Sequence, residues 1–295
     1  MIRFVIPAYN ESENIANLMA DLGPRARKLG ARIVFVDDGS TDGTAEAIAA
    51  HRDGLHLAVV RHGVNRGLGT AINSGLRAAL GEAQDGDAIV TIEADNTSDL
   101  DDLPKMLERF HAGADVVLAS VYAPGGRIVG VAPWRLAASK AVSNSFRVAG
   151  GLKEIHTLSS LYRVYRAGTL RRAADTYGWL LVREPGFAAN VELLLKLYNA
   201  GAKVDEVPTV NDWGRRQGVS KMNLKPTVMA YGRLMAAHLV GRIQPPPLSP
   251  LSGDEVAQPT GPRRLEEEGG RSPSVLQRLE ADGRLQTAGL DAPRR

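Results

Sequence analysis

Three kinds of feature are missing from this chain of 295 residues, and each absence excludes a class of protein. There is no cysteine, so disulfides and thiolate metal sites are excluded, and the composition fits a reducing compartment. No run of about 18 uncharged apolar residues occurs, so we expect no segment that spans a bilayer. The first residues, Met1 to Pro7, open directly into a strand pattern, so we expect no signal peptide.

A strong charge of either sign is also lacking. The formal net charge is +3 at pH 7, and no cluster mixes aromatic with basic side chains in the manner of single-strand nucleic-acid binders. We therefore expect no nucleic-acid partner. The 44% hydrophobic content instead suits one large α/β domain, with or without an appendage.

Strand and helix patterns alternate along the first half of the chain. Apolar runs at residues 3–6, 31–36 and 57–61 are separated by helical patterns at residues 13–29 and 42–51. This order predicts an α/β fold, a Rossmann-like, mostly parallel sheet flanked by helices. From Pro245 onward the sequence is rich in proline, glycine, serine and charge. We therefore predict one domain over residues 1–243 and a disordered tail over residues 244–295.

Two carboxylates follow the buried strand pattern at residues 88–92. The run ends in Glu93-Ala94-Asp95, and residues two positions apart point to the same side of an extended chain. Ligands of open α/β sheets bind at the carboxyl ends of the strands. Such a pair can hold a divalent metal that clamps a diphosphate. An ordinary polar turn with solvated acids accounts for these residues equally well at this point.

Three further segments each allow two interpretations. The glycine-rich turn at residues 65–71 is neither a P-loop nor a dinucleotide fingerprint, and it serves either a ligand or tight packing. The basic loop at residues 211–222 suits a phosphate but also fits an ordinary solvated loop. Residues 224–243 predict a helix that either caps the core or lies on a membrane surface.

Motifs in a fixed order along residues 1–243 point to one family. They are Pro7-Ala8-Tyr9-Asn10-Glu11, Val36-Asp37-Asp38-Gly39-Ser40-Thr41-Asp42-Gly43-Thr44, Gly67-Leu68-Gly69-Thr70-Ala71, Glu93-Ala94-Asp95, Tyr162-Arg163-Val164-Tyr165-Arg166, Glu206-Val207-Pro208, and R-x-x-G-x-S-K from Arg215 to Lys221. With these motifs the chain resembles the family 2 glycosyltransferases of GT-A fold, and most closely the dolichyl- or polyprenyl-phosphate mannose synthases.

The resemblance implies a role for each matching residue. The nucleotide-sugar donor would be lined by Pro7, Tyr9 and Glu11 at base and ribose, by Val36 and Asp38 at the base, and by Ala94. Glu93 and Asp95 match the family's metal-binding D-x-D, with Mg²⁺ or Mn²⁺ as cofactor, and Thr97 stands where a third metal-side contact is placed. Asp95, Arg215 and Lys221 are the implied catalytic residues, with Arg215 and Lys221 binding phosphates of donor or acceptor.

The activity that the resemblance implies is an inverting transfer of a sugar, with GDP-mannose favoured as donor, to a polyprenyl phosphate. It implies a cytoplasmic protein in peripheral contact with the inner face of the membrane. An ionised phosphate acceptor needs no strong general base. A hydroxyl acceptor would need a carboxylate, for which Glu192 and Asp212 are candidates.

The sequence departs from the family pattern at three positions. Glu93 replaces the first aspartate of the D-x-D, Val121 stands where the synthases usually carry an arginine, and Thr157 replaces an acidic residue. Arg127 or Arg135 would have to compensate for Val121. The alternatives are a transferase using UDP-glucose or another donor with a non-lipid acceptor, a non-catalytic nucleotide-sugar-binding protein, and a nucleotidyltransferase. The last normally has a glycine-rich basic loop after its first strand, which residues 7–11 lack.

Overall fold

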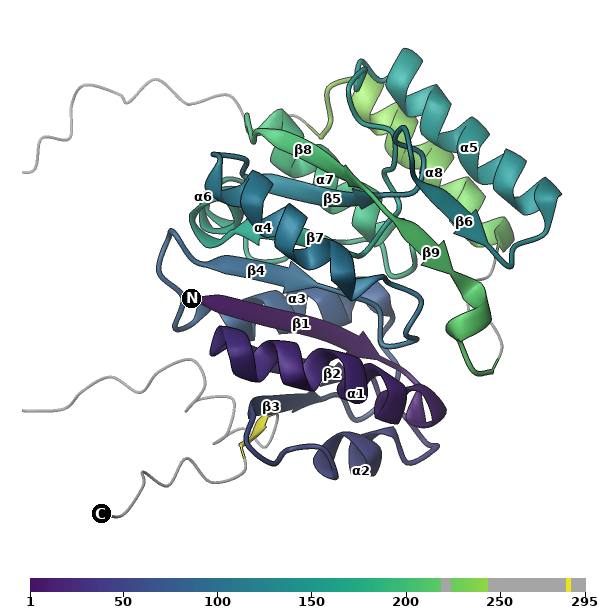
Figure 1. The fold of residues 1–295 in the computed structure, drawn as a ribbon. Helices are drawn as coiled ribbons and strands as arrows, with labels where there is room; N and C mark the ends of the chain where they lie inside the picture. Colours follow the sequence, from purple (N-terminus) through teal and green to yellow (C-terminus); the bar gives the residue numbers. More distant parts are fainter. Residues whose placement is uncertain (219–223, 244–284, 288–295) are drawn as a thin grey trace, which may run out of the picture.

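The computed structural model describes residues 1–218, 224–243 and 285–287 (Figure 1). An eight-stranded sheet runs through this part of the chain in the order β10-β3-β2-β1-β4-β7-β5-β8. Its strands are β1 (Ile2–Ala8), β2 (Arg32–Asp37), β3 (His56–Arg61), β4 (Ala88–Thr91), β5 (Val116–Ser120), β7 (Arg163–Arg166), β8 (Val204–Pro208) and β10 (Leu285–Thr287).

Most neighbouring strands are parallel. The pairs β1–β2, β2–β3, β1–β4 and β5–β8 are parallel, whereas β7 runs antiparallel between β4 and β5, and β10 runs antiparallel to β3. The predicted mostly parallel, Rossmann-like sheet is therefore confirmed. Strand β7 begins at Arg163, and residues 158–162 before it form a loop.

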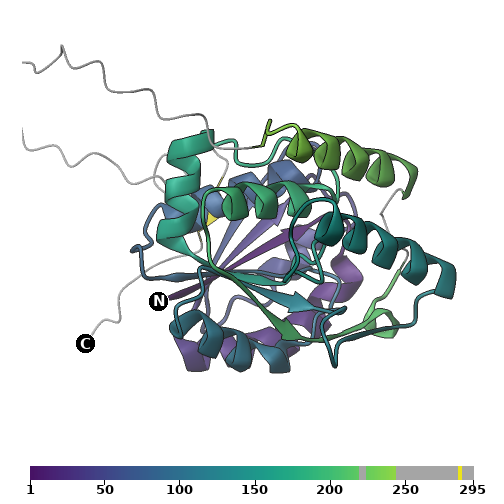
Figure 2. The same cartoon turned by 90° about the horizontal axis from the view of Figure 1, so that it is seen from above.

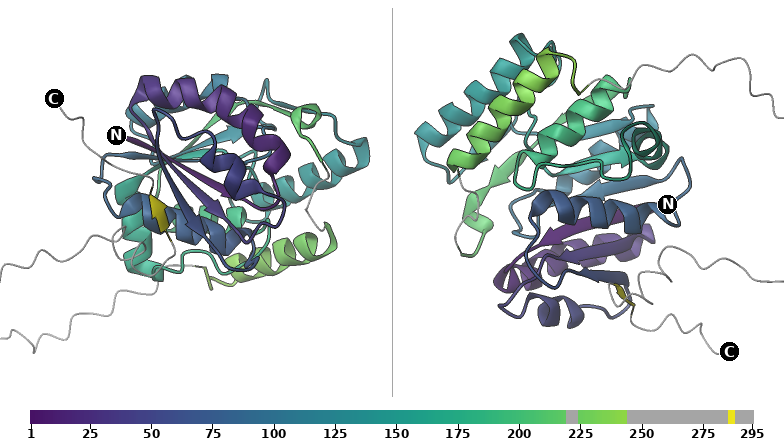
Figure 3. Two further views of the ribbon diagram at one scale, coloured as in Figure 1. Left: turned by 90° about the horizontal axis from the view of Figure 1, so that it is seen from below. Right: turned by 180° about the vertical axis from the view of Figure 1, so that it is seen from behind.

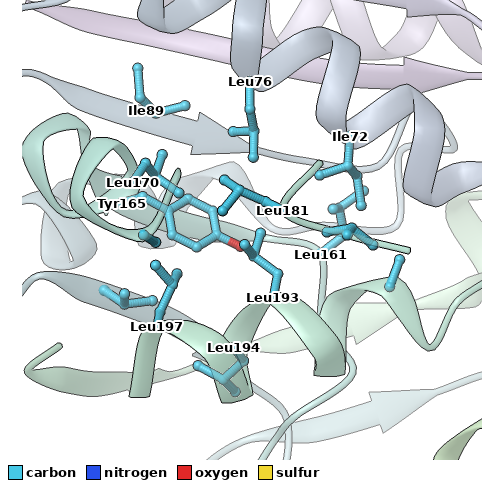
Figure 4. Packing of buried hydrophobic residues seen from close by; sticks show 14 of the residues in the cluster. Ile72, Leu76, Ile89, Leu161, Tyr165, Leu170, Leu181, Leu193, Leu194 and Leu197 are labelled. Atoms are coloured by element: carbon cyan, nitrogen blue, oxygen red, sulfur yellow. The ribbon is translucent and has the colours of Figure 1, made fainter. Parts of the chain in front are cut away.

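Helices cover both faces of the sheet (Figure 2). One face carries α1 (Ser12–Leu29), α2 (Thr44–Ala49) and α4 (Leu103–His111), and the other carries α3 (Leu68–Leu80), α6 (Ala167–Tyr177) and α7 (Ala189–Asn199). Strand β1 alternates between them, since Phe4 and Ile6 enter one core and Val5 the other. Figure 4 shows the second core, where Leu76, Leu181 and Leu193 pack around Tyr165.

Close contact between α3 and the sheet depends on Gly75. A Cβ on Gly75 would lie 2.4 Å from Val5 Cγ1 and 3.0 Å from Val36 Cγ2. A larger residue would push α3 away from β1 and β2. The glycine-rich turn at residues 65–71 runs directly into α3, whose first residue is Leu68. The contact at Gly75 therefore also fixes where that turn lies.

A second group of elements lies beyond the β8 side of the sheet. It comprises β6 (Arg127–Val129), β9 (Val210–Asp212), α5 (Pro133–Val148), α8 (Leu224–Leu239) and the short helix η2 (Trp213–Arg215), which follows β9. The short helix η1 (Leu100–Asp102) lies apart from this group and directly precedes α4. Strands β6 and β9 form a separate parallel pair. Helices α5 and α8 run side by side (Figures 1 and 3), joined by Phe146 in a shared core and by His238 Nε2, which lies 2.8 Å from the Gly150 carbonyl oxygen.

In the described part of the chain, no helix has the length and apolar character needed to cross a bilayer. Residues 244–284 and 288–295 of the predicted tail lie outside the described part, and within the tail Leu285–Thr287 form β10 on the β3 edge. Helix α8 buries Ala230 and Leu234 against the core, as expected of a capping helix, but leaves Val228 and Met229 exposed.

The start of β1 is fixed by a buried ion pair, which generates a prediction. Asp87 accepts from the N-terminal ammonium at 2.6 Å, from Arg3 Nη1 at 2.5 Å and from the Gln84 N–H at 2.8 Å. Burial alone would raise the pKa of Asp87, but these three donors outweigh it and lower the pKa to about 2. A lowered carboxyl pKa stabilises the fold above the unfolded-state pKa, and this contribution is lost as the pH falls toward 2.

We expect Asp87→Asn to lower the free energy of unfolding by about 2 kcal/mol at pH 7, with the difference from the parent falling to about half of that near pH 3. Urea unfolding of both proteins between pH 3 and pH 7 measures this difference. A difference that stays constant over this range would show that the carboxylate charge of Asp87 does not contribute.

Candidate active site

A cavity of about 440 Å³ opens at the carboxyl ends of β1, β2 and β4. Seven of the residues named from the sequence line it together: Pro7, Tyr9, Glu11, Asp38, Glu93, Ala94 and Asp95. The remaining walls come from the turn at 65–71, from residues 159–161 and 184–190, from Arg216, and from residues 226–233 of α8. The sheet therefore gathers side chains from widely separated parts of the sequence into one site.

Three other named residues lie outside the cavity. Val36 is fully buried in the core behind the cavity, where it packs toward Gly75. Thr97 is buried and does not line the cavity, but it holds Asp95. Arg215 is exposed at the end of η2 and outside the cavity. Lys221 lies outside the described residues.

Asp95 is held on both of its carboxylate oxygens. Oδ1 accepts from the Thr97 hydroxyl at 2.8 Å and from the Thr97 N–H at 3.2 Å. Oδ2 accepts from Arg216 Nη1 at 3.0 Å, and Arg216 Nη2 lies 3.5 Å from Glu11 Oε1. The arginine that faces the acids is therefore Arg216, the neighbour of the residue chosen from the motif.

Glu93 joins the end of β4 to the loop before β7. Its Oε2 accepts from the Ser98 hydroxyl at 2.6 Å, and its Oε1 accepts from the Leu161 N–H at 3.1 Å. Burial raises the pKa of Glu93, and the nearby negative charge of Asp95 raises it further. A cation placed between the two carboxylates would relieve both effects.

Asp38 organises the glycine-rich turn. It lies 2.6 Å from His62 Nδ1 and accepts from the N–H groups of Arg66 at 3.0 Å and Gly67 at 2.8 Å. Gly67 has φ of 87°, and a Cβ there would lie 2.5 Å from the Pro185 carbonyl oxygen, so only glycine fits. A carboxylate has about four acceptor positions. Since three are used within the described structure, Asp38 can accept one further donor from the cavity.

Two buried charged side chains position the far wall. Arg163 donates to the carbonyl oxygens of Leu158 at 2.5 Å and Asn190 at 2.8 Å. Glu192 accepts from the N–H groups of Arg183 at 2.7 Å and Glu184 at 2.8 Å, and from Lys196 Nζ at 2.7 Å. Glu192, a candidate base in the sequence, is thus committed to holding residues 183–184 and does not line the cavity.

Other sequence candidates also lie away from the cavity. Asp212 accepts from the Gly214 N–H at 2.9 Å and caps η2. Arg127 is exposed in β6, and the Arg135 guanidinium lies 5.6 Å from the centre of the Trp134 ring, so neither places a charge in the cavity. Thr157, at the position of an expected acid, shares a hydrogen bond of 2.9 Å with Ser120.

The sequence reasoning missed three charged residues of the cavity. They are Arg216 and the ion pair of Arg233 with Glu184, whose Nη2 and Oε2 atoms lie 3.1 Å apart. Two adjacent arginines at 215–216 were a usable signal, but the motif selects only the first. Nothing in the spacing of Glu184 and Arg233 indicates that they meet.

The acids fit a divalent cation that arrives with a phosphate ligand. Among the residues that the structure describes, no group of three or more His, Cys, Asp or Glu side chains could hold a metal by itself. Mg²⁺ is commonly bound by one or two carboxylates together with substrate phosphates, and Glu93 and Asp95 provide two. The site therefore matches a metal–diphosphate better than a free metal ion.

The sequence is similar to a family of known proteins and to several of its members. The model of Glycosyl transferase family 2 matches residues 4–172. A polyprenol monophosphomannose synthase from Mycolicibacterium smegmatis is 32% identical over 224 residues, which cover 74% of this chain and 80% of that protein. A dolichol-phosphate mannosyltransferase from Pyrococcus furiosus is 29% identical over 233 residues, but the chain covers only 62% of that protein. An undecaprenyl-phosphate 4-deoxy-4-formamido-L-arabinose transferase from Pseudomonas aeruginosa is 32% identical over 170 residues, which cover 56% of this chain and 47% of that protein.

Solved structures show the same fold. Glucosyl-3-phosphoglycerate synthase from Mycobacterium tuberculosis, crystallised with Mn²⁺, UDP-glucose and phosphoglyceric acid, aligns with a TM-score of 0.57 and 18% identity. The alignment covers 83% of this chain and 80% of that chain. The GT-A architecture expected from the motifs is therefore confirmed.

The role of Glu192 gives a second prediction. Glu192→Ala would leave Lys196 buried without its carboxylate partner, so we expect unfolding free energy to fall by about 3–5 kcal/mol. The double variant Glu192→Leu, Lys196→Leu should recover part of that loss because no buried charge remains. Thermal unfolding of the parent, of these two variants and of Glu192→Gln measures this. An unchanged unfolding temperature in Glu192→Gln, together with lost turnover, would instead make Glu192 a base.

Proposed function

The chain belongs to glycosyl transferase family 2, and we propose that it moves a sugar, with mannose favoured, from a nucleotide-sugar donor to a polyprenyl phosphate, inverting the anomeric carbon. One observation carries the proposal: the cavity brings Tyr9, Asp38 and the acids Glu93 and Asp95 together at the carboxyl edge of the sheet. The similarity to a polyprenol monophosphomannose synthase and to a dolichol-phosphate mannosyltransferase supports the choice of sugar and acceptor.

We place the donor at the part of the cavity that contains Tyr9, Asp38 and the acids. Here Pro7, Tyr9 and Glu11 flank the nucleoside, and Asp38 uses its remaining acceptor position for an N–H of the base. Ala94 is nearly fully buried between the two acids and presents a small side chain, which allows the nucleotide to approach the backbone. Val36 does not contact the donor, but it supports the position of α3 from the core behind the cavity. GDP-mannose is the donor we favour.

A divalent cation, Mg²⁺ or Mn²⁺, fits beside Asp95 and Glu93 together with the donor diphosphate. When bound, it would neutralise charge on the leaving nucleoside diphosphate. Thr97 acts through Asp95, because its hydroxyl and N–H fix the orientation of that carboxylate. Catalysis by this chain's own residues then consists of positioning and charge neutralisation.

We place the acceptor at the wall of the cavity to which α8 contributes. Leu161, Phe187, Pro226 and Ala230 provide an apolar lining there, beside the ion pair of Arg233 with Glu184, and Pro226 and Ala230 belong to α8. A polyprenyl phosphate has an anionic head that is ionised at neutral pH and attacks without a strong base. We assign Arg215 and Lys221 of the basic loop to phosphates of donor or acceptor, as the motif implies.

Peripheral contact with the inner face of the cytoplasmic membrane is part of the proposal. Trp134 on α5 is 61% exposed and Met229 on α8 is 59% exposed, although both are large apolar residues. Amphipathic helices with basic residues nearby bind anionic lipid surfaces in this way. Other exposed apolar residues on or beside the two helices are Val148, Val228, Leu239 and Val240, and exposed basic ones are Lys140, Lys225, Arg233 and Arg242.

The direct test is transfer from GDP-mannose to a short polyprenyl phosphate with Mg²⁺ or Mn²⁺, followed by mass spectrometry of the lipid. We expect Asp95→Ala to lower turnover by at least about a hundredfold while the unfolding temperature stays within a few degrees of the parent. Near-parental turnover of this variant would remove the acid pair from the mechanism. Transfer only from UDP-glucose, only to a non-lipid acceptor, or not at all would replace the proposal by one of its alternatives.

The membrane contact gives a separate prediction. The double variant Trp134→Glu, Met229→Glu should lose most of its binding to vesicles that contain anionic lipid, measured by flotation at low salt, because both side chains are already exposed and the fold is kept. Val64→Glu is the matched control and should bind vesicles as the parent does. Val64 is 65% exposed, but it lies before the glycine-rich turn and belongs to neither α5 nor α8. Equal flotation of the double variant and the parent would contradict this contact.

A further inference from the structure

Arg216 stands between two carboxylates of the cavity at the place where a metal and a diphosphate would have to be accommodated. Its guanidinium bridges Asp95 Oδ2 at 3.0 Å and Glu11 Oε1 at 3.5 Å. Only 9% of the Arg216 side chain is exposed, as is 9% of Glu11, so solvent screens this contact weakly. The contact is part of the interior of the site, and its partners are the residues assigned to the donor.

The other oxygen of Asp95 is already committed. Oδ1 accepts twice from Thr97, which leaves Oδ2 as the oxygen that a cation can approach. Arg216 occupies that oxygen. A dication and a guanidinium repel each other at such short range in a poorly solvated cavity. Binding of a metal at Asp95 therefore requires Arg216 to move away.

The segment that carries Arg216 is attached on both sides. The Gln217 N–H donates to Asn14 Oδ1 at 2.8 Å, and Asn14 Nδ2 donates to the Gln217 carbonyl oxygen at 3.1 Å. On the other side the Asp212 N–H donates to the Thr97 carbonyl oxygen at 3.2 Å. These backbone attachments hold the loop over the acids, so we expect the Arg216 side chain, and not the backbone of the loop, to move when Asp95 is released.

We infer that Arg216 is an exchangeable counter-ion, which neutralises Asp95 and Glu11 until the divalent cation arrives with the nucleoside diphosphate. The displaced guanidinium then binds the diphosphate, for which its planar donor pair is well suited. This inference rests on the proposed function. It has one consequence for binding: the metal alone competes with Arg216, whereas the metal and the nucleotide together provide Arg216 with a new anionic partner. Each ligand therefore strengthens the binding of the other.

The experiment measures binding of Mn²⁺ alone by electron paramagnetic resonance to the full-length parent and three variants. Arg216→Ala should bind Mn²⁺ roughly tenfold more tightly than the parent, because the competing charge-assisted contact is gone. Arg216→Lys keeps a positive charge but lacks the paired donors of a guanidinium, so its affinity for Mn²⁺ should lie between those of the parent and Arg216→Ala. Arg215→Ala is the matched control from the same loop, and its affinity for Mn²⁺ alone should equal that of the parent.

The second measurement repeats the titrations with saturating GDP. In the parent GDP should tighten Mn²⁺ binding strongly, and in Arg216→Ala this enhancement should shrink by about the same factor by which Mn²⁺ alone binds more tightly. Equal affinity for Mn²⁺ alone in parent and Arg216→Ala, with equal enhancement by GDP, would overturn the inference and leave the proposed transfer intact if the parent still makes product. Absence of Mn²⁺ binding in every variant, with GDP and with UDP, would overturn the inference and the metal-dependent part of the proposed function together.

Discussion

Carboxylates in a poorly solvated cavity have to be neutralised or hydrogen-bonded, and this requirement organises the whole site. Each acid is satisfied by a different segment of the chain. Asp38 binds the N–H groups of the glycine-rich turn, Glu93 binds the Leu161 N–H, and Asp95 binds Arg216. The hydrogen bonds of the acids therefore hold three loops, far apart in the sequence, around one cavity.

The sheet makes this convergence possible because it is rigid and its parallel strands end at one edge. Strand β1 pairs with β2 on one side and β4 on the other, so Tyr9, Asp38 and the acids after β4 are presented together. Helices on both faces bury β1, β2 and β4 almost completely. Gly75 lets α3 approach the sheet closely, and this contact fixes the position of the glycine-rich turn that leads into α3. Packing in the core thus sets positions in the cavity, and Val36 illustrates this, since it contributes without touching the cavity.

The sequence was sufficient for features that depend on one segment at a time. The strands, the edge at which they end and the acids that follow them can be read from apolar runs interrupted by polar residues. Features that depend on two distant segments could not be read in this way. Arg216 and Glu11 are 205 positions apart, and which of two adjacent arginines turns inward depends on the short helix η2, which ends at the first of them. Glu192 looked like a possible base because a helical pattern does not reveal that residues 183–184 and Lys196 use both of its oxygens.

Helix α8 connects the polar chemistry of the cavity to the outer surface of the protein. Its residues Pro226 and Ala230 form part of the cavity wall, while Val228 and Met229, in the same turns, face outward and are exposed. An acceptor with an anionic head and a long apolar chain needs both environments at once, because neither part is stable in the surroundings of the other. Under the proposed function, a lipid surface resting on the outer face of α8 would be separated from the cavity only by the diameter of that helix, so the phosphate could enter the cavity while the chain remains in an apolar phase.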